Sequence, residues 1–125
     1  MKPKEKGDLA VAHAINYFLL SGYEVCLPIG DKKPYDLVVE LNGGLQKVQV
    51  KYAGRWKADN KCHASLRTMG GNQSYYTAKK YSKTDFDLLF VHSENNNDYL
   101  VPWVEIENTN SLSIECGKFL QYKLQ

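Results

Sequence analysis

Two β-forming runs on either side of a tight turn constrain this chain more than any other feature. Tyr35–Leu41 and Leu45–Tyr52 are rich in Val, Leu and Tyr, and the segment between them, Asn42-Gly43-Gly44, is a strong turn signal. In the second run, valines alternate with the polar residues Lys47, Gln49 and Lys51. Successive side chains of a strand point to opposite faces. The pattern therefore predicts an antiparallel hairpin with one apolar and one polar face.

The segments around this hairpin indicate a mixed α/β domain. Apolar residues with a period of about 3.6 predict a helix over Leu9–Leu20, with Asp8 as its N-cap. A second helix is expected over Ser74–Ser82, and long loops with at most one short strand over Gly54–Gly71. Further strands are predicted at Tyr23–Ile29, Phe86–His92, Tyr99–Val101 and Leu112–Cys116. A chain of 125 residues suffices for one core, so residues 1–125 are expected to form one domain, a central mixed β-sheet flanked by helices.

Basic residues are concentrated in the middle of the chain. Residues 47–83 contain nine Lys or Arg and one acidic residue, a net charge of +8, whereas residues 1–46 carry −1 and residues 84–125 carry −5. Clustered cations bind polyanions because they neutralise phosphates, although a solvated basic loop without a partner has the same composition. The residues expected to contact nucleic acid are Lys47, Arg55, Lys57, Lys61, Arg67, Tyr75, Lys79, Lys80 and Lys83.

Several other classes of protein fit the sequence poorly. The three cysteines are odd in number and widely spaced, which is typical of reduced thiols in a cytoplasmic protein. No apolar run is long enough to cross a membrane, and no cleavage pattern of a secretory signal follows the basic N-terminus. His13, His63 and His92 are scattered and lack the spacing of a zinc site.

The polar face of the hairpin carries the chemistry. Asp36 is expected to lie across from Gln49 and Lys51, because antiparallel strands bring the start of one close to the end of the other. A carboxylate, a second oxygen ligand and an ammonium group are what metal-assisted phosphodiester hydrolysis needs. Mg²⁺ takes oxygen ligands, acidifies a bound water, and a lysine neutralises charge in the transition state. The spacing alone is weak evidence, since ordinary solvent-facing strands carry the same residue types.

Four segments in order resemble the PD-(D/E)XK endonucleases: Lys6–Ala10, Pro28–Asp31, Pro34–Val38 and Lys47–Lys51. The chain is similar in particular to homing endonucleases encoded by group I introns, whose core is similar to that of Holliday junction resolvases. Residues 84–88 and 101–102 also fit, so the resemblance spans roughly residues 4 to 105. It implies a restriction-endonuclease-like core and a homing or junction-resolving endonuclease that requires Mg²⁺ or Mn²⁺. It also implies double-stranded or branched DNA as substrate and a homodimer or homotetramer.

The resemblance also implies residue roles. Asp36 matches the metal-binding aspartate, Gln49 the second ligand position, the carbonyl of Val50 the backbone ligand, and Lys51 the catalytic lysine. The chain departs from the family at Val11, where a glutamate of the first helix is usual.

Three interpretations of Val11 stay open. The chain is a substituted form with lost or impaired activity. Alternatively, Asp8, three residues earlier on the same helical face, replaces the missing acid. In the third interpretation, the domain keeps the fold and binds DNA without cutting it.

Overall fold

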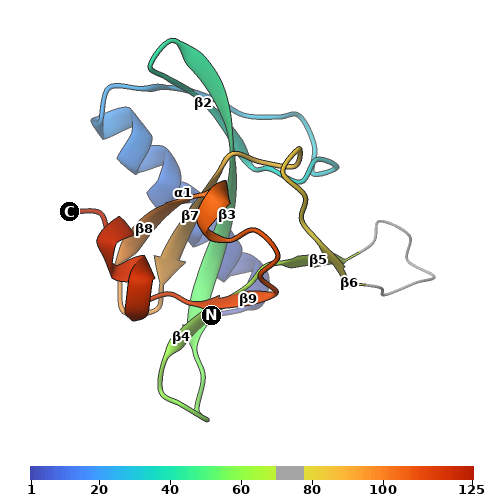
Figure 1. The fold of residues 1–125 in the computed structure, drawn as a ribbon. Coiled ribbons are helices and arrows are strands. Elements are labelled where there is room, and N and C mark those ends of the chain that lie inside the picture. The colour runs from blue at the N-terminus through green and yellow to red at the C-terminus, as the bar shows by residue number, and fades with distance from the viewer. Residues whose placement is uncertain (70–77) are drawn as a thin grey trace.

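The structure is a computed structural model that describes residues 1–69 and 78–125 (Figure 1). It contains an α-helix, nine strands and two short 3₁₀-helices within these ranges. Their bounds, in chain order, are α1 (Pro3–Leu20), β1 (Glu24–Cys26), β2 (Leu37–Leu41), β3 (Gly44–Arg55), β4 (Cys62–Ser65), β5 (Arg67–Met69), β6 (Ala78–Lys80), β7 (Leu88–Ser93), β8 (Asp98–Pro102), η1 (Trp103–Glu105), β9 (Ser111–Ser113) and η2 (Gly117–Tyr122). None of the described helices is both long and apolar enough to cross a bilayer.

Helix α1 begins earlier than the sequence pattern predicts. Its first residue is Pro3, which suits a position whose backbone has no N–H to donate within the helix. Lys2 precedes it as the N-cap, and the Lys2 backbone N–H donates to the Glu5 carboxylate at 3.1 Å. The prediction of Asp8 as N-cap is therefore wrong, because proline and this contact start the helix more than a turn before Asp8.

The predicted hairpin is confirmed and forms the centre of the sheet. Strands β2 and β3 are antiparallel, with Leu37 opposite Val48, and the turn residues Asn42 and Gly43 have φ angles of 52° and 82°. Positive φ at both positions is the geometry that two-residue hairpin turns require. Strand β7 lies parallel to β3 on its other side, so the main sheet has the order β1-β2-β3-β7-β8 and is mixed. The second half of β3 also pairs with β4, which continues to β9.

The sheet separates two cores. On one face, Ala10, Ala14 and Phe18 of α1 pack on side chains of β2, β3 and β7 that include Val48 and Val50. On the other face, Leu89 and Val91 of β7 pack with β4, β8, β9 and the segments that join them. Alternation along β3 therefore directs Lys47, Gln49 and Lys51 to the face opposite α1.

Two sequence-based predictions differ from the structure in the basic segment. Residues 78–80 of the helix expected over Ser74–Ser82 form strand β6, which pairs with β5, while residues 74–77 lie outside the described part of the chain. Gly54–Gly71 is not mainly loop, because β3 continues to Arg55 and β4 and β5 follow. The missed signal is the alternation of Cys62, Ala64 and Leu66, which are all buried. Small apolar residues make this alternation weak in the sequence.

The opposite face of the sheet has a different cover from the one expected. Among the described residues α1 is the only α-helix, and β4, β9 and the two 3₁₀-helices pack where a second helix was predicted. Figure 1 shows β5 and β6 extending away from the body of the domain.

Candidate active site

Asp36 is tied to the middle of β3 by two hydrogen bonds. Its backbone N–H donates to the Val48 carbonyl at 2.8 Å, and its Oδ2 accepts from the Val50 N–H at 2.8 Å. Because Leu37 is opposite Val48, the next step in the register places Asp36 opposite Gln49. Asp36 is half-buried. Loss of water raises the pKa of its carboxyl, and the Val50 N–H and the Lys51 ammonium oppose this rise. Burial outweighs both effects, so the pKa of the Asp36 carboxyl stays above its ordinary value.

Gln49 is held by a residue from a distant part of the chain. Its side chain is buried, and its Nε2 donates to the Tyr81 hydroxyl at 3.2 Å. Neither Gln49 Oε1 nor Asp36 Oδ1 has a hydrogen-bond partner among the described residues. The hydroxyl therefore occupies the nitrogen end of the amide and leaves its oxygen available as a ligand.

Tyr81 also lies beside Lys51. The Lys51 ammonium is 5.3 Å from the centroid of the Tyr81 ring, within the range of a cation–π contact. In the described part of the chain Lys51 forms no ion pair. Its charge acts on Asp36, where it partly offsets the rise in the carboxyl pKa that burial causes. The ammonium is therefore free to meet a phosphate.

The backbone of Val50 completes the oxygen set. In a strand, the N–H and C=O of one residue point to the same side. Since the Val50 N–H points at Asp36, its carbonyl is directed to the same edge, beyond the first residue of β2. One carboxylate and two neutral oxygens fit the preference of Mg²⁺ or Mn²⁺ for oxygen ligands. They supply a single formal negative charge.

Comparison with known proteins identifies this arrangement. The sequence model of the family described as PD-(D/E)XK endonuclease matches residues 1–118. The chain belongs to the PD-(D/E)XK endonuclease family. A solved structure of a bacterial homing endonuclease, I-Ssp6803I, is similar to this chain with a TM-score of 0.85 and 27% sequence identity. The similarity covers 98% of this chain and 89% of that one. No curated protein sequence matches the chain. The family and the restriction-endonuclease-like fold predicted from the sequence are confirmed.

Within the PD-(D/E)XK fold, the first helix carries the two positions that the sequence left open. Val11 is half-buried and packs with the α1-side core, where its isopropyl group offers no ligand. The Asp8 side chain is 71% exposed, and its carboxylate lies 3.8 Å from the Lys4 ammonium. An exposed ion pair of this kind contributes little and breaks easily, so Asp8 is available to other partners.

Four of the basic residues expected to contact DNA lie in or beside the β3–β4 turn and in the β5–β6 ribbon. Lys57 and Lys61 are exposed in and beside the β3–β4 turn, and Arg67 lies opposite Lys80 in the β5–β6 ribbon. Lys83 is also exposed. Tyr75 and the side chain of Lys79 lie outside the described part of the structure.

Two other predicted DNA contacts have protein partners. The Lys47 ammonium donates to the Thr84 carbonyl and lies 5.8 Å from the centroid of the Tyr35 ring. Arg55 donates to the side chains of Asn60 and Asn95. These contacts orient both side chains.

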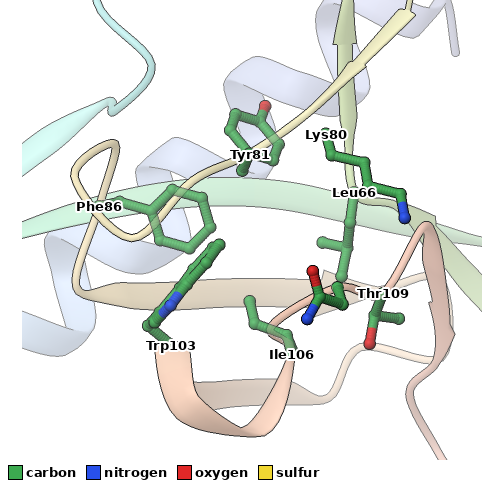
Figure 2. A pocket seen from close by; sticks show the side chains of 8 residues that line it. Leu66, Lys80, Tyr81, Phe86, Trp103, Ile106 and Thr109 are labelled. Carbon is green, nitrogen blue, oxygen red and sulfur yellow. The ribbon is translucent and has the colours of Figure 1, made fainter.

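Tyr81 is the site residue whose role sequence analysis missed. Figure 2 shows it at the edge of a hollow, where Phe86 lies between Tyr81 and Trp103. The Phe86 ring meets Tyr81 edge-on at 5.0 Å and Trp103 at 5.3 Å between centroids. This packing fixes the hydroxyl against Gln49, and no local sequence signal connects positions 49 and 81.

Proposed function

We propose that this chain is a metal-dependent DNA endonuclease that hydrolyses phosphodiester bonds with Asp36, Gln49, the Val50 carbonyl and Lys51. The observation that carries the proposal is the hydrogen bond from the Val50 N–H to Asp36. It holds the carboxylate at the edge of β3 toward which the Val50 carbonyl is directed, with Gln49 across the register. Membership of an endonuclease family makes hydrolysis of nucleic acid the chemistry to test first.

Each residue has a distinct task in this mechanism. Asp36 and the oxygens of Gln49 and Val50 would hold Mg²⁺ or Mn²⁺, which when bound would supply an acidified water and polarise the phosphate. Tyr81 positions Gln49 through its hydroxyl. Lys51 places its ammonium near Asp36. There it neutralises the charge that develops on the phosphate in the transition state.

The proposed substrate is double-stranded or branched DNA. The exposed cations Lys57, Lys61, Arg67, Lys80 and Lys83 supply charge for contacts to its phosphates. The similarity to a solved homing endonuclease supports DNA as the substrate. Cleavage of both strands requires two active sites, so a homodimer or homotetramer is part of the proposal.

Val11 favours a second candidate, a DNA-binding domain that keeps the nuclease fold without cutting. With Gln49 neutral and Val11 apolar, Asp36 is the one carboxylate among the five family positions. Each missing carboxylate weakens the attraction for a divalent cation. Exposed Asp8 remains the candidate replacement for the absent acid.

Cleavage assays distinguish the two candidates. Supercoiled and branched DNA are incubated with Mg²⁺ or Mn²⁺ and either the unchanged chain or its Val11→Glu, Asp8→Ala or Lys51→Ala variant. Cleavage that Val11→Glu increases and Lys51→Ala abolishes supports the endonuclease. Loss of cleavage in Asp8→Ala assigns the second carboxylate to Asp8. DNA binding without cleavage by the unchanged chain and by Val11→Glu, at matched folding measured by circular dichroism, refutes the endonuclease and supports the binding domain.

A further inference from the structure

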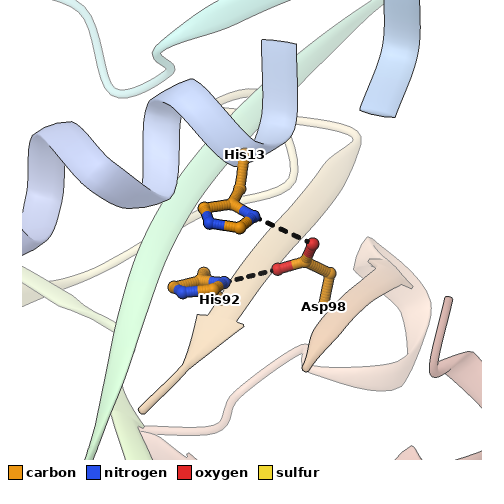
Figure 3. A group of neighbouring side chains, drawn as sticks. All are labelled: His13, His92 and Asp98. Atoms are coloured by element: carbon orange, nitrogen blue, oxygen red, sulfur yellow. Dashed lines mark hydrogen bonds and ion pairs between the residues drawn. The ribbon is translucent and has the colours of Figure 1, made fainter. Parts of the chain in front are cut away.

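A second group of metal-ligating side chains lies on the α1 side of the sheet, away from Gln49 and Lys51. His13 of α1, His92 of β7 and Asp98 of β8 each offer one ligand atom, and these atoms all lie within 4.8 Å of one another (Figure 3). Sequence spacing gave no sign of this group, because its members come from α1 and from the two strands of the β7–β8 hairpin.

Both imidazoles direct the same nitrogen at one carboxylate. His92 Nδ1 lies 2.6 Å from Asp98 Oδ1, and His13 Nδ1 lies 3.4 Å from Asp98 Oδ2. Bonds of 2.0 to 2.2 Å in tetrahedral geometry set ligand atoms roughly 3.3 Å apart. The His13–Asp98 separation matches this value, whereas the His92–Asp98 separation is that of a hydrogen bond and has to lengthen when an ion binds between the two side chains. We propose that His13, His92 and Asp98 bind a divalent transition metal of the Zn²⁺ type.

Burial and charge support a built site. His92 is 3% exposed and Tyr52 packs against its ring, so one ligand is held rigidly. Within the described chain, Asp98 has no Lys or Arg partner, and its charge is shared by the two histidines alone. Nitrogen ligands with one carboxylate suit Zn²⁺ or Co²⁺, whereas the oxygen set around Asp36 suits Mg²⁺. The two sites therefore differ in the metals they take.

A metal ion can reach the three side chains from the side on which His13 lies, and His13 is the ligand that can change its orientation. His13 and Asp98 line a hollow that also includes Asn16, Tyr17 and Gln125. The two imidazole rings stack with centroids 3.9 Å apart and planes 19° apart, so their lone pairs run side by side. Convergence on one ion requires a rotation of the His13 ring, whose side chain is one-third exposed and has room to move. The hollow then supplies water as the fourth ligand.

Isothermal titration of the tag-free chain with Zn²⁺ tests the proposal. An Asp36→Asn background removes the oxygen site, and one Zn²⁺ per chain is expected to bind. His13→Ala is expected to weaken this binding by roughly 10-fold or more, at least the effect of losing a residue that merely orients a ligand. Asp98→Asn, which keeps the shape of the side chain, is expected to weaken it similarly. Co²⁺ in place of Zn²⁺ is expected to show the visible absorption of a four-coordinate ion, lost in His13→Ala.

His63 of β4 provides a matched control. His63 lies 2.7 Å from Asp59 but has no third ligand in the described structure, so His63→Ala should leave Zn²⁺ affinity unchanged. Absence of Zn²⁺ binding, binding unaffected by His13→Ala, or binding lost in His63→Ala overturns the proposal. His13→Ala decides the result if Asp98→Asn misfolds, because alanine at a helix-surface position preserves α1.

Discussion

The substitution Tyr81→Phe removes one hydroxyl group from the candidate active site. It distinguishes the positioning of Gln49 by the Tyr81 hydroxyl from the packing of the Tyr81 ring. The substitution keeps the ring, and with it the edge-on contact with Phe86 and the cation–π contact with Lys51. It removes the acceptor of the Gln49 Nε2 hydrogen bond, and Gln49 is 9% exposed. A neutral hydrogen bond contributes about 1 kcal/mol, and an unsatisfied buried partner costs about 1–3 kcal/mol. We therefore expect the free energy of unfolding to fall by about 1–2 kcal/mol.

The same change should alter metal binding. Without the hydroxyl, the Gln49 amide is free to rotate, and its oxygen no longer has a preferred direction. A residue that orients a ligand contributes roughly 10-fold or more to metal affinity, so Mn²⁺ should bind about 10-fold more weakly in calorimetric titrations. This measurement does not depend on cleavage, so it applies even if Val11 impairs activity.

A double-mutant cycle in urea with Gln49→Ala provides the stringent test. If the two side chains interact as described, their coupling energy should be about 1 kcal/mol. Tyr17→Phe is the control, because the Tyr17 hydroxyl has no hydrogen-bond partner among the described residues, and its loss should change stability by less than about 0.5 kcal/mol. Additive single substitutions combined with unchanged Mn²⁺ affinity would refute the positioning role of Tyr81.

Three further predictions follow from other parts of the molecule. Burial opposes ionisation of Glu115, but hydrogen bonds from Asn97 and other neighbours outweigh it and lower the Glu115 pKa. The stabilisation by ionised Glu115 is therefore present above the ordinary pKa of 4.5 and is lost as the pH falls through the lowered pKa. In urea unfolding at a series of pH values, Glu115→Gln should show a smaller loss of the free energy of unfolding on acidification. Burial raises the pKa of Cys62 to about 11, so at pH 8 iodoacetamide should modify exposed Cys26 and spare Cys62, as mass spectrometry of peptides would reveal. DNA affinity should fall steeply with salt, and Lys57→Ala should reduce the slope of log K against log salt by about 1, whereas a flat salt response would contradict a phosphate-binding surface.

The hairpin and its polar face could be predicted because local signals agree there. The turn residues Asn42 and Gly43 accept the positive φ that the hairpin needs, and alternation along β3 assigns each side chain to a face. The register then follows, and Asp36 comes opposite Gln49 without knowledge of the rest of the chain.

The basic segment could not be predicted in the same way. Residues 78–80 adopt a strand because Arg67 and its neighbours pair with them, and this pairing joins parts of the chain with no local relation. Tyr81 and the His13–His92–Asp98 group depend on tertiary contacts of the same kind. Such contacts leave no periodic trace in the sequence.

The length of β3 has a consequence for how this enzyme family can vary. Its twelve residues are shared by β2, β4 and β7, and the proposed reactive groups lie halfway along it. Movement of those groups would break the pairing of β3 with both β2 and β7. The proposed reactive groups therefore lie in the part of the domain that tolerates structural change least. The ribbon and turn at its periphery carry the exposed cations Lys57, Lys61, Arg67 and Lys80 and pair with fewer neighbouring strands. In the proposed endonuclease, substitutions at the rim would therefore change target preference while the reacting centre stays unchanged.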